Sequence, residues 1–340
     1  MTTLSMRPKR TSLPAAPKRR GPNRRNRRGS ARRWVALILL LGSTTVSAAP
    51  FSITHPSGIE VHLTPNPVTN GRTVLLEINA RNLADPIVGI QAWNGNKSIP
   101  VFRHPIKGPG DFVGFIGISY FRQSETVDLK LEWTNRNGYH MLQFPIEVTR
   151  GRFKKEKLRV PKSKVAPSKS DRLRIADEKS TIKEIYNTPH PTRLWDTAFV
   201  MPATGMVTSP FGSQRVLNGK LNSYHNGVDF RAPTGTPIYA ANDGIVRFAR
   251  NLFYSGNHLI IDHGLGIFTG YSHLSEFRVE PGQRVHRGQE IGLAGATGRV
   301  NGPHLHWAAK VNGINVDPLQ LMGLIEALFV ADPDFLTESE

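Results

Sequence analysis

Apolar and charged residues alternate strictly over residues 127–133, where Val, Leu, Leu and Trp are separated by Asp, Lys and Glu. This period of two predicts a strand with one buried face and one solvated face. Similar runs occur at 59–63, 72–80, 87–92, 98–103, 112–119 and 139–149. Turn dipeptides such as Asn70-Gly71 and Asn137-Gly138 separate them. Residues 50–149 are therefore predicted to form an immunoglobulin-like β-sandwich, in which no cluster of reactive side chains stands out.

A second set of short β runs, separated by glycines, lies near the C-terminus at 238–241, 244–249, 258–262, 267–273, 290–294 and 304–311. No helix alternates with these runs, and the glycine-rich stretch 292–298 precedes a strand, whereas a dinucleotide site would need a helix there. We expect an antiparallel β-sheet domain over 195–340 with its core at 205–320. The fold class is then all-β.

The segment between the two β regions has a different character. Residues 150–170 are basic and are interrupted by Pro161 and Pro167, which is typical of a linker. Residues 175–186 predict one short helix, which Pro189 and Pro191 would end. Residues 150–194 are thus expected to be a basic linker with a short helix.

The N-terminus has the pattern of a secretory signal. Residues 1–33 carry twelve Lys or Arg and no acid, and an apolar run from Trp34 passes into small residues ending at Ala48 and Ala49. This predicts a signal peptide over 1–48, cleaved after Ala48. An uncleaved anchor in the inner membrane is the second interpretation, although sixteen residues from Trp34 to Ala49 are short for a span. Either way the protein is expected to be exported to the periplasm or cell envelope, with membrane contact only through this segment.

The net charge of +18 invites a nucleic-acid interpretation, but its position argues against one. The leader contributes +12 and the stretch 150–174 contributes +9, so the rest of the chain carries −3. Neither predicted β domain is notably basic, and no nucleic-acid partner is expected. The chain has no cysteine, so neither disulfides nor thiolate ligands are available. Any metal must be held by histidine and carboxylate.

Histidines gather in the C-terminal region, where seven of the twelve lie between residues 225 and 306. His304 and His306 flank Leu305, and in a strand residues i and i+2 project from the same face. His225 and Asp229, separated by Asn-Gly-Val, could complete a set of ligands for zinc, which takes three protein ligands and one water in catalytic sites. Gly227 argues against a helix there and favours a loop entering a strand. A lone His-x-His pair is also common as an ordinary surface or core pair.

Six segments follow one another in the C-terminal region: Ser209-Pro-Phe-Gly212, His225-Asn-Gly-Val-Asp-Phe230, Ala232-Pro-Thr-Gly-Thr-Pro237, Ile261-Asp-His-Gly264, Tyr271-Ser-His-Leu-Ser275 and Gly302-Pro-His-Leu-His-Trp307. In this order they resemble the lysostaphin-type or LytM-like zinc endopeptidases, which cut peptide cross-bridges in bacterial peptidoglycan. Together they span about residues 205–320. Trp307 stands where Phe is common in the family, and the loop 214–224 has a length that could differ between specificities.

The resemblance implies one Zn²⁺ held by His225, Asp229 and His306, with His273 and His304 as the catalytic pair. Asp262, His263 and Asn301 are weaker hypotheses for residues that orient the ligands, and an ordinary turn or strand-end role is favoured for each. The implied activity is hydrolysis of peptidoglycan cross-links, with a diaminopimelate-type link favoured over a glycyl bridge. In similar exported proteins an N-terminal domain can cover the cleft, which implies intramolecular inhibition.

Two other functions stay open at this stage. The same fold serves as a non-catalytic envelope module that binds peptidoglycan or activates an amidase, although such proteins usually lack part of the five-residue set. A bacteriolytic enzyme secreted against other species would share the chemistry and differ in location. The filled set of five favours an active enzyme.

Overall fold

The computed structural model describes residues 51–330 except positions 84, 124, 160–165 and 220. The expected leader at 1–48 lies outside the described residues, so both interpretations of it stay predictions. Within the described part of the chain, every helix is too short or too polar to cross a bilayer.

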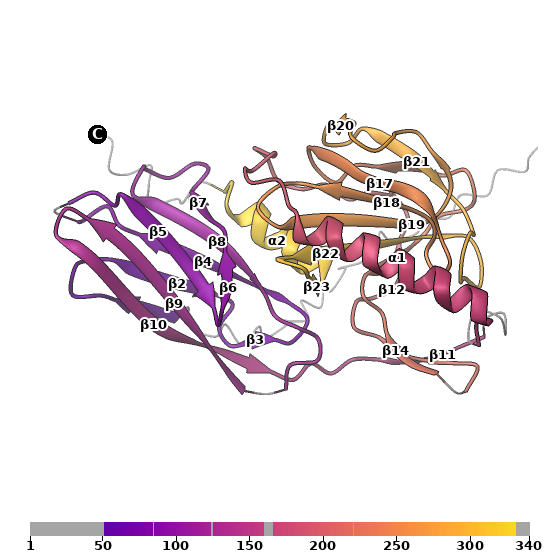
Figure 1. The fold of residues 1–340 in the computed structure, drawn as a ribbon, viewed down its shortest axis with the longest axis horizontal. Helices are drawn as coiled ribbons and strands as arrows, with labels where there is room; N and C mark the ends of the chain where they lie inside the picture. The colour runs from indigo at the N-terminus through magenta and orange to yellow at the C-terminus, as the bar shows by residue number, and fades with distance from the viewer. Residues whose placement is uncertain (1–50, 84, 124, 160–165, 220, 331–340) are drawn as a thin grey trace, which may run out of the picture. The chain divides into compact units, whose positions relative to one another are not determined.

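The N-terminal region contains two five-stranded sheets (Figure 1). The first has the order β1 (Phe51–Thr54), β2 (Glu60–Thr64), β4 (Thr73–Asn79), β8 (Asp111–Gly117) and β7 (Val101–Arg103). The second has the order β3 (Val68–Thr69), β10 (Gly138–Thr149), β9 (Glu125–Asn135), β5 (Gly89–Asn94) and β6 (Lys97–Ile99). One hydrophobic cluster takes side chains from both sheets, including Leu76 from β4 and Trp133 from β9. The region is therefore a two-layer sandwich.

Each run predicted from alternation overlaps at least one strand, but the run 98–103 divides in two. Pro100 separates β6 from β7, and these strands belong to different sheets. Proline has no backbone N–H to donate to a ladder, so it marks a place where the chain can leave one sheet for the other. Strands β1 and β3 were not predicted.

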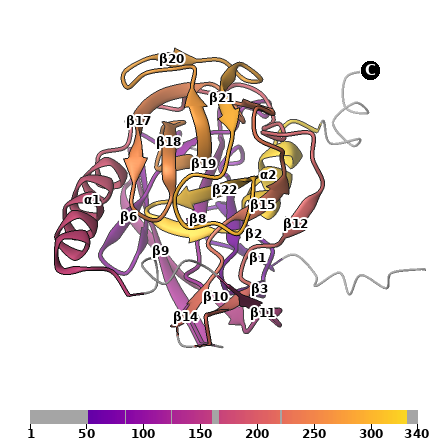
Figure 2. The same cartoon turned by 90° about the vertical axis from the view of Figure 1, so that its right-hand side faces the viewer.

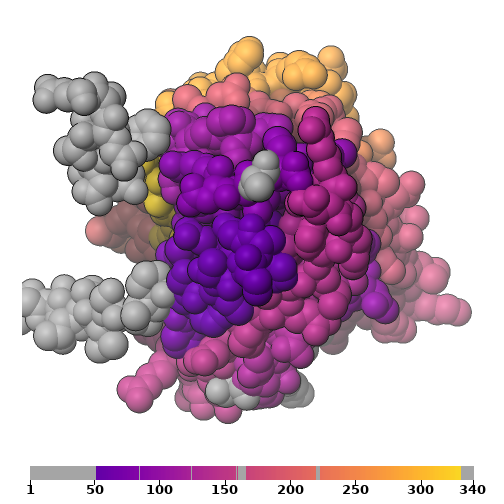
Figure 3. All heavy atoms as spheres, turned by 90° about the vertical axis from the view of Figure 1, so that its left-hand side faces the viewer, coloured from indigo at the N-terminus to yellow at the C-terminus, as the bar shows by residue number. Residues whose placement is uncertain are grey.

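Figure 3 shows the surface of this sandwich, with the indigo segment of the first strands beside the magenta hairpin of β9 and β10. The His55 ring lies 4.8 Å from the Trp133 ring and 6.2 Å from the His140 ring, measured between centroids. His55 and His140 thus pack against other rings of the sandwich.

The C-terminal region is built on a ten-stranded sheet (Figure 2). Its main path is β12 (Val207–Ser209), β15 (Val228–Arg231), β22 (His304–Val311), β19 (Ile267–Phe277), β18 (Gly256–Asp262), β17 (Gly244–Leu252) and β20 (Arg284–Val285). Off this path, β16 (Pro237–Tyr239) pairs with β21 (Glu290–Ala294), β21 also pairs with β19, and β23 (Ile314–Val316) pairs with β22. Every pairing in this sheet is antiparallel, as expected.

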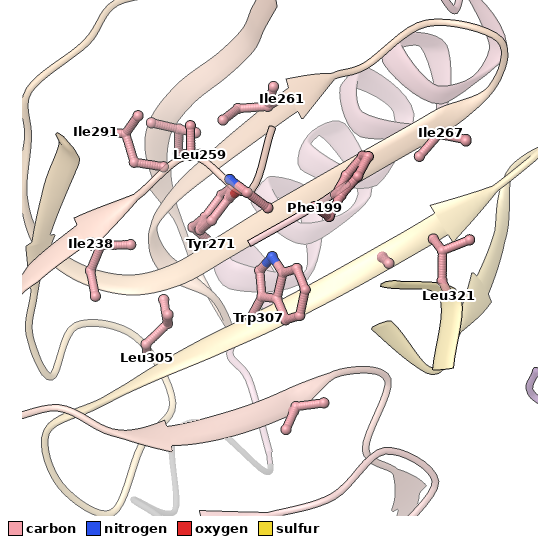
Figure 4. Packing of buried hydrophobic residues seen from close by; sticks show 14 of the residues in the cluster. Phe199, Ile238, Leu259, Ile261, Ile267, Tyr271, Ile291, Leu305, Trp307 and Leu321 are labelled. Atoms are coloured by element: carbon pink, nitrogen blue, oxygen red, sulfur yellow. The ribbon is translucent and has the colours of Figure 1, made fainter. Parts of the chain in front are cut away.

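The apolar face of the sheet is densely packed (Figure 4). Leu305 and Trp307 of β22 lie with Tyr271 of β19 and Ile238 of β16, and all four are almost completely buried. Burying an aliphatic side chain of this size stabilises a fold by about 1.5–3 kcal/mol relative to exposure. Because Leu305 and Trp307 point into this core, alternation turns His304 and His306 to the opposite face.

Two helices complete the region. Helix α1 (Lys169–Asn187) begins six residues before the predicted helix, because Ser168 and Asp171 form a capping box that satisfies the first backbone N–H groups. Its Ile182, Ile185 and Tyr186 pack against Phe268 and neighbouring residues of β17 and β18. Figures 1 and 2 show the helix alongside this sheet. Helix α2 (Pro318–Ala327), which was not predicted, has Asp317 as its N-cap and Pro318 in its first turn.

Part of the expected linker is a strand. Strand β11 (Lys155–Leu158) pairs in parallel with β13 (Gln214–Leu217). Strand β13 also pairs with β14 (Leu221–Tyr224), and the three strands form one sheet. The residues Lys-Glu-Lys at 155–157 show no alternation of apolar and polar side chains, so composition alone indicates a solvated tether. The strand brings Glu156 beside the site described next.

Candidate metal centre

The centre is assembled on strands β15 and β22. In their antiparallel register Asp229 is the direct partner of His306, and Arg231 is the partner of His304. Directly opposite residues in such a pair have their Cβ atoms about 4.5–5.5 Å apart. Sheet pairing therefore brings together a carboxylate and an imidazole that are 77 positions apart in sequence.

His225 reaches the same point from the loop before β15. Its backbone N–H donates to the carbonyl of Ser213, and its carbonyl accepts from Gly212. Gly227 lets this loop pass close to β22, since a Cβ at that position would lie 2.3 Å from the Trp307 carbonyl oxygen and 2.8 Å from the His306 ring. No real side chain fits at such distances, which gives the predicted role of Gly227 in this loop a steric reason.

Three possible ligand atoms converge. The Nε2 atom of His225 lies 2.8 Å from Asp229 Oδ1 and 2.9 Å from His306 Nδ1, and Asp229 Oδ1 lies 2.8 Å from His306 Nδ1. Among the described residues, these form the group of acidic and imidazole side chains arranged to hold a metal ion.

The protonation of His225 fits a cation held by these three atoms. Its Nδ1 lies 2.9 Å from the carbonyl oxygen of Pro210, which only accepts, so Nδ1 carries the proton. The Nε2 lone pair then faces a carboxylate oxygen and a second imidazole nitrogen. Burial lowers the pKa of His225 to about 4, although the hydrogen bond with Asp229 acts in the opposite direction. Three acceptors this close repel one another unless a positive charge lies between them, so the donor set fits a metal.

Asp229 is held ionised. Burial by itself would raise the pKa of its carboxyl, but the adjacent side chains of His225 and His306 outweigh burial and hold the pKa below its usual range. An ionised carboxylate and two imidazoles are a typical set of protein ligands for zinc.

His273 and His304 stand beside the triangle, with ring centroids 4.8 Å apart. Nδ1 of His273 donates to the Thr297 carbonyl at 2.8 Å, and Nδ1 of His304 donates to the Gly302 carbonyl at 2.8 Å. Both rings therefore keep the Nε2 lone pair free of a backbone partner. The His304 Nε2 lies 3.8 Å from Asp229 Oδ1, beside the three converging atoms.

His273 reaches this face through a backbone irregularity. The register of β19 against β18 shifts between the pairs at Leu274 and Tyr271, and His273 has φ of 64°. Simple alternation from buried Tyr271 would direct His273 into the core. The bulge and the left-handed backbone turn the side chain towards His304 instead. Burial, followed by the nearby His306 and His304, lowers the pKa of His273 well below the ordinary value, so the ring is neutral near pH 7.

Arg215 and Glu156 support the metal ligand Asp229. Arg215 Nη2 donates to Asp229 Oδ2 at 2.7 Å, while Arg215 Nε donates to Glu156 at 3.4 Å. Ser209 Oγ lies within 3.1 Å of both Glu156 and His225 Nδ1. The parallel pairing of β11 with β13 carries Glu156 and Arg215 to the centre, although Glu156 lies in the segment predicted from composition to be a linker.

The three residues weighed as orienting groups have other surroundings. Asp262 is fully buried and accepts hydrogen bonds from Arg247 and the backbone of His190 and Gly264. His263 bonds to the Asp243 carbonyl and the Thr269 hydroxyl. Asn301 lines the cleft, with an exposed side chain. Asp262 and His263 thus have structural partners of their own, and Glu156, Ser209 and Arg215 are residues beside the centre that sequence reasoning missed.

All five predicted site residues therefore meet in one place. Asp229, His273, His304 and His306 line an open cleft of about 540 Å³, and buried His225 lies directly behind them. Tyr254, Arg299 and Asn301 form another part of its wall. One face of an antiparallel sheet thus carries a His-Asp-His triangle that could hold a metal ion, beside two further imidazoles.

Residues 223–318 match the sequence model of the family described as Peptidase family M23. The range includes all five site residues.

Curated relatives with described activities share this domain. The chain is 51% identical over 96 residues to the Peptidoglycan DD-endopeptidase ShyA of Vibrio cholerae, covering 28% of this chain and 22% of that protein. It is 40% identical over 117 residues to the DD-carboxypeptidase/endopeptidase Mpg of Neisseria meningitidis, covering 34% of this chain and 26% of that protein. The chain thus spans about a quarter of the length of these relatives.

A solved structure extends the likeness beyond the matched domain. The crystal structure of a putative peptidase M23 from Pseudomonas aeruginosa superposes with a TM-score of 0.58 at 28% identity, covering 76% of this chain and 95% of that one. The similarity in fold therefore includes residues outside 223–318.

Proposed function

We propose that this protein is a zinc-dependent endopeptidase that hydrolyses peptide cross-links of bacterial peptidoglycan. The observation that carries the proposal is the triangle of His225 Nε2, Asp229 Oδ1 and His306 Nδ1, with sides of 2.8–2.9 Å, next to two imidazoles with free Nε2 atoms. The names of ShyA and Mpg support peptidoglycan as the substrate. A non-catalytic module would have no use for the complete set of five.

His225, Asp229 and His306 would hold the ion, and zinc is the metal that two imidazoles and one carboxylate suit best in a hydrolase. When bound, zinc supplies a Lewis acid that polarises the scissile carbonyl and makes water a better nucleophile at neutral pH. Arg215 holds Oδ2 of Asp229, so Oδ1 stays turned towards the two ligand imidazoles. The backbone carbonyl of Pro210 fixes the tautomer of His225.

His273 and His304 perform the proton transfers. Each carries its proton on Nδ1, so each offers Nε2 as an acceptor for a proton from the attacking water. A protonated Nε2 can then donate to the leaving amine, or hydrogen-bond the oxygen on which negative charge develops. Both rings bond a backbone carbonyl through Nδ1 in the same way, so this geometry favours neither His273 nor His304 as the general base. Positioned acid–base groups of this kind contribute about 10²–10⁴-fold in rate.

The regions outside the metal centre also have proposed roles. The N-terminal sandwich is immunoglobulin-like, which its strand order supports, because β2-β4-β8-β7 facing β10-β9-β5 reproduces the four- and three-strand sheets of that topology. Residues 1–48 direct export to the periplasm or envelope, cleaved or retained as an anchor. Inhibition by the sandwich stays a prediction; the described residues that line the cleft begin at Glu156.

Digestion of purified sacculi of known cross-link type tests the proposal. The zinc-loaded protein should convert cross-linked dimers into monomers, which mass spectrometry of the muropeptides identifies, together with the bond cut, once a muramidase has digested the glycan strands. His306→Ala should bind no zinc and release nothing. Full activity of zinc-depleted His306→Ala protein would show that the triangle is not the reaction centre.

A further inference from the structure

Arg299 is the charged wall residue of the cleft that the reaction scheme above does not use. It lies in the loop between β21 and β22, two residues after Thr297, whose carbonyl holds the His273 ring. It shares the cleft with His273 and His304. Its guanidinium is therefore placed where substrate must pass.

The position of Arg299 is fixed by its surroundings. Its backbone N–H donates to the Tyr254 carbonyl at 2.8 Å, and its guanidinium carbon lies 4.4 Å from the centroid of the Tyr254 ring. Gly298, with φ of 83°, lets the loop press against the turn at Gly256, since a Cβ there would lie 2.3 Å from the Gly256 nitrogen. The stack on Tyr254 covers one face of the guanidinium and leaves its edge of N–H donors for a ligand.

Among the described residues that line the cleft, no acidic side chain is paired with this cation. The acidic side chains that line the cleft are Glu156 and Asp229, and Arg215 bonds to both. Burial lowers the pKa of Arg299, and Arg215 adds to this effect, but a guanidinium stays charged at neutral pH. A partly desolvated cation with a rigid fork of donors is suited to a carboxylate.

We infer that Arg299 is a specificity-determining residue that binds a free carboxylate on the substrate residue supplying the amine of the scissile amide. This inference rests on the proposed peptidase function. In a diaminopimelate-type cross-link, the carbon that bears the amide nitrogen also bears a free carboxylate. A glycyl bridge has no charged group there. The protein is therefore built for the diaminopimelate type, with the carboxylate on Arg299 while His273 and His304 address the amide.

The test uses two purified cross-linked muropeptide dimers, one with the free carboxylate next to the scissile amide and one with that group converted to a carboxamide. The wild-type full chain, loaded with zinc, should cleave the carboxylate dimer with about 10- to 100-fold higher kcat/KM, the range of a charge-assisted pair. Arg299→Gln should cleave both dimers equally, at about the rate of wild type on the carboxamide. Arg299→Lys, which keeps charge without the fork, should retain part of the preference.

Controls separate specificity from folding and from catalysis. Zinc content and far-UV circular dichroism of Arg299→Gln should match wild type, and the exposed Arg284→Gln should keep the full preference. Calorimetric binding of the dimers to zinc-stripped protein gives a readout without turnover, and the preference should appear there too. If Arg299→Gln does not fold, the rates of wild type and of Arg299→Lys on the two dimers still test the inference.

The outcomes are distinct. Turnover by wild type with no preference between the dimers, or a preference that survives in Arg299→Gln, overturns the inference and leaves the peptidase function standing. Absence of turnover on both dimers and on sacculi by zinc-loaded wild type overturns the proposed function and the inference together.

Discussion

Removing the Arg215 guanidinium should weaken zinc binding while leaving every ligand in place. In the protein, Arg215 Nη2 donates to Asp229 Oδ2 at 2.7 Å, and the side chains are only 20% and 10% exposed. In Arg215→Gln the carboxylate loses its charged partner and is free to rotate, so Oδ1 is no longer held towards His225 and His306. Glu156, 16% exposed, loses the same partner.

The size of the effect follows from this geometry. Partners that orient metal ligands typically change affinity by about 10- to 100-fold, which corresponds to about 1.4–2.8 kcal/mol. The low exposure of both charges and the short bond place Arg215 near the upper end. Glu156→Gln removes a support one step further out, through a longer contact of 3.4 Å, and should cost less. Because Glu156 acts through Arg215, the two effects should not add in the double variant.

A competition titration against a zinc indicator at pH 7 measures these affinities. Arg231→Gln is the matched control, since Arg231 is exposed on β15 two residues from Asp229 and should leave zinc binding unchanged. A zinc Kd for Arg215→Gln within about twofold of wild type would refute the argument that ion pairing orients the ligand. Tighter binding would refute it too, because it would mean that the cation mainly reduces the negative charge offered to the metal.

Other changes have equally definite outcomes. His304→Ala should keep stoichiometric zinc by elemental analysis yet lose about 10²–10⁴-fold in turnover on sacculi, and loss of the metal would contradict its assignment to proton transfer. Gly227→Ala should lower the free energy of unfolding by about 1–3 kcal/mol and impair zinc binding, because the added methyl meets the Trp307 carbonyl at 2.3 Å. Burial lowers the pKa of His263 to about 4, so the unfolded chain takes up a proton below pH 6.5 while the folded chain does not. Stability is therefore lost as the pH falls from about 6.5 to 4, and urea unfolding of His263→Gln should show about 2 kcal/mol less loss between pH 7 and 5.

The sequence predicted the parts of this protein that depend on local pattern. Period-two alternation in β22 correctly separated His304 and His306 from Leu305 and Trp307, because one strand face is core and the other is cleft. The loop entering β15 at Gly227 was also correct, and its reason is contact with β22.

The parts that were missed depend on contacts between distant segments. Glu156 lies in a run of charges that predicts solvent, and only its pairing with β13 brings it to Arg215. The orientation of His273 follows from a bulge, and strict alternation would have directed it into the core. Resemblance to known peptidases supplied the role of His273 without supplying this geometry. Proline at position 100 was visible in the sequence, but the change of sheet that it permits was not.

At His273 the left-handed backbone disfavours a residue with a Cβ, whereas the proposed chemistry requires an imidazole there. For a residue with a Cβ this conformation costs about 1–2 kcal/mol, and glycine or asparagine would tolerate it better. Any search for thermostable variants that scores backbone preference will therefore select against the imidazole. We expect the most heat-resistant substitutions at this position to yield a well-folded protein that binds its substrate without cleaving it. Such a variant would be useful for trapping the complex.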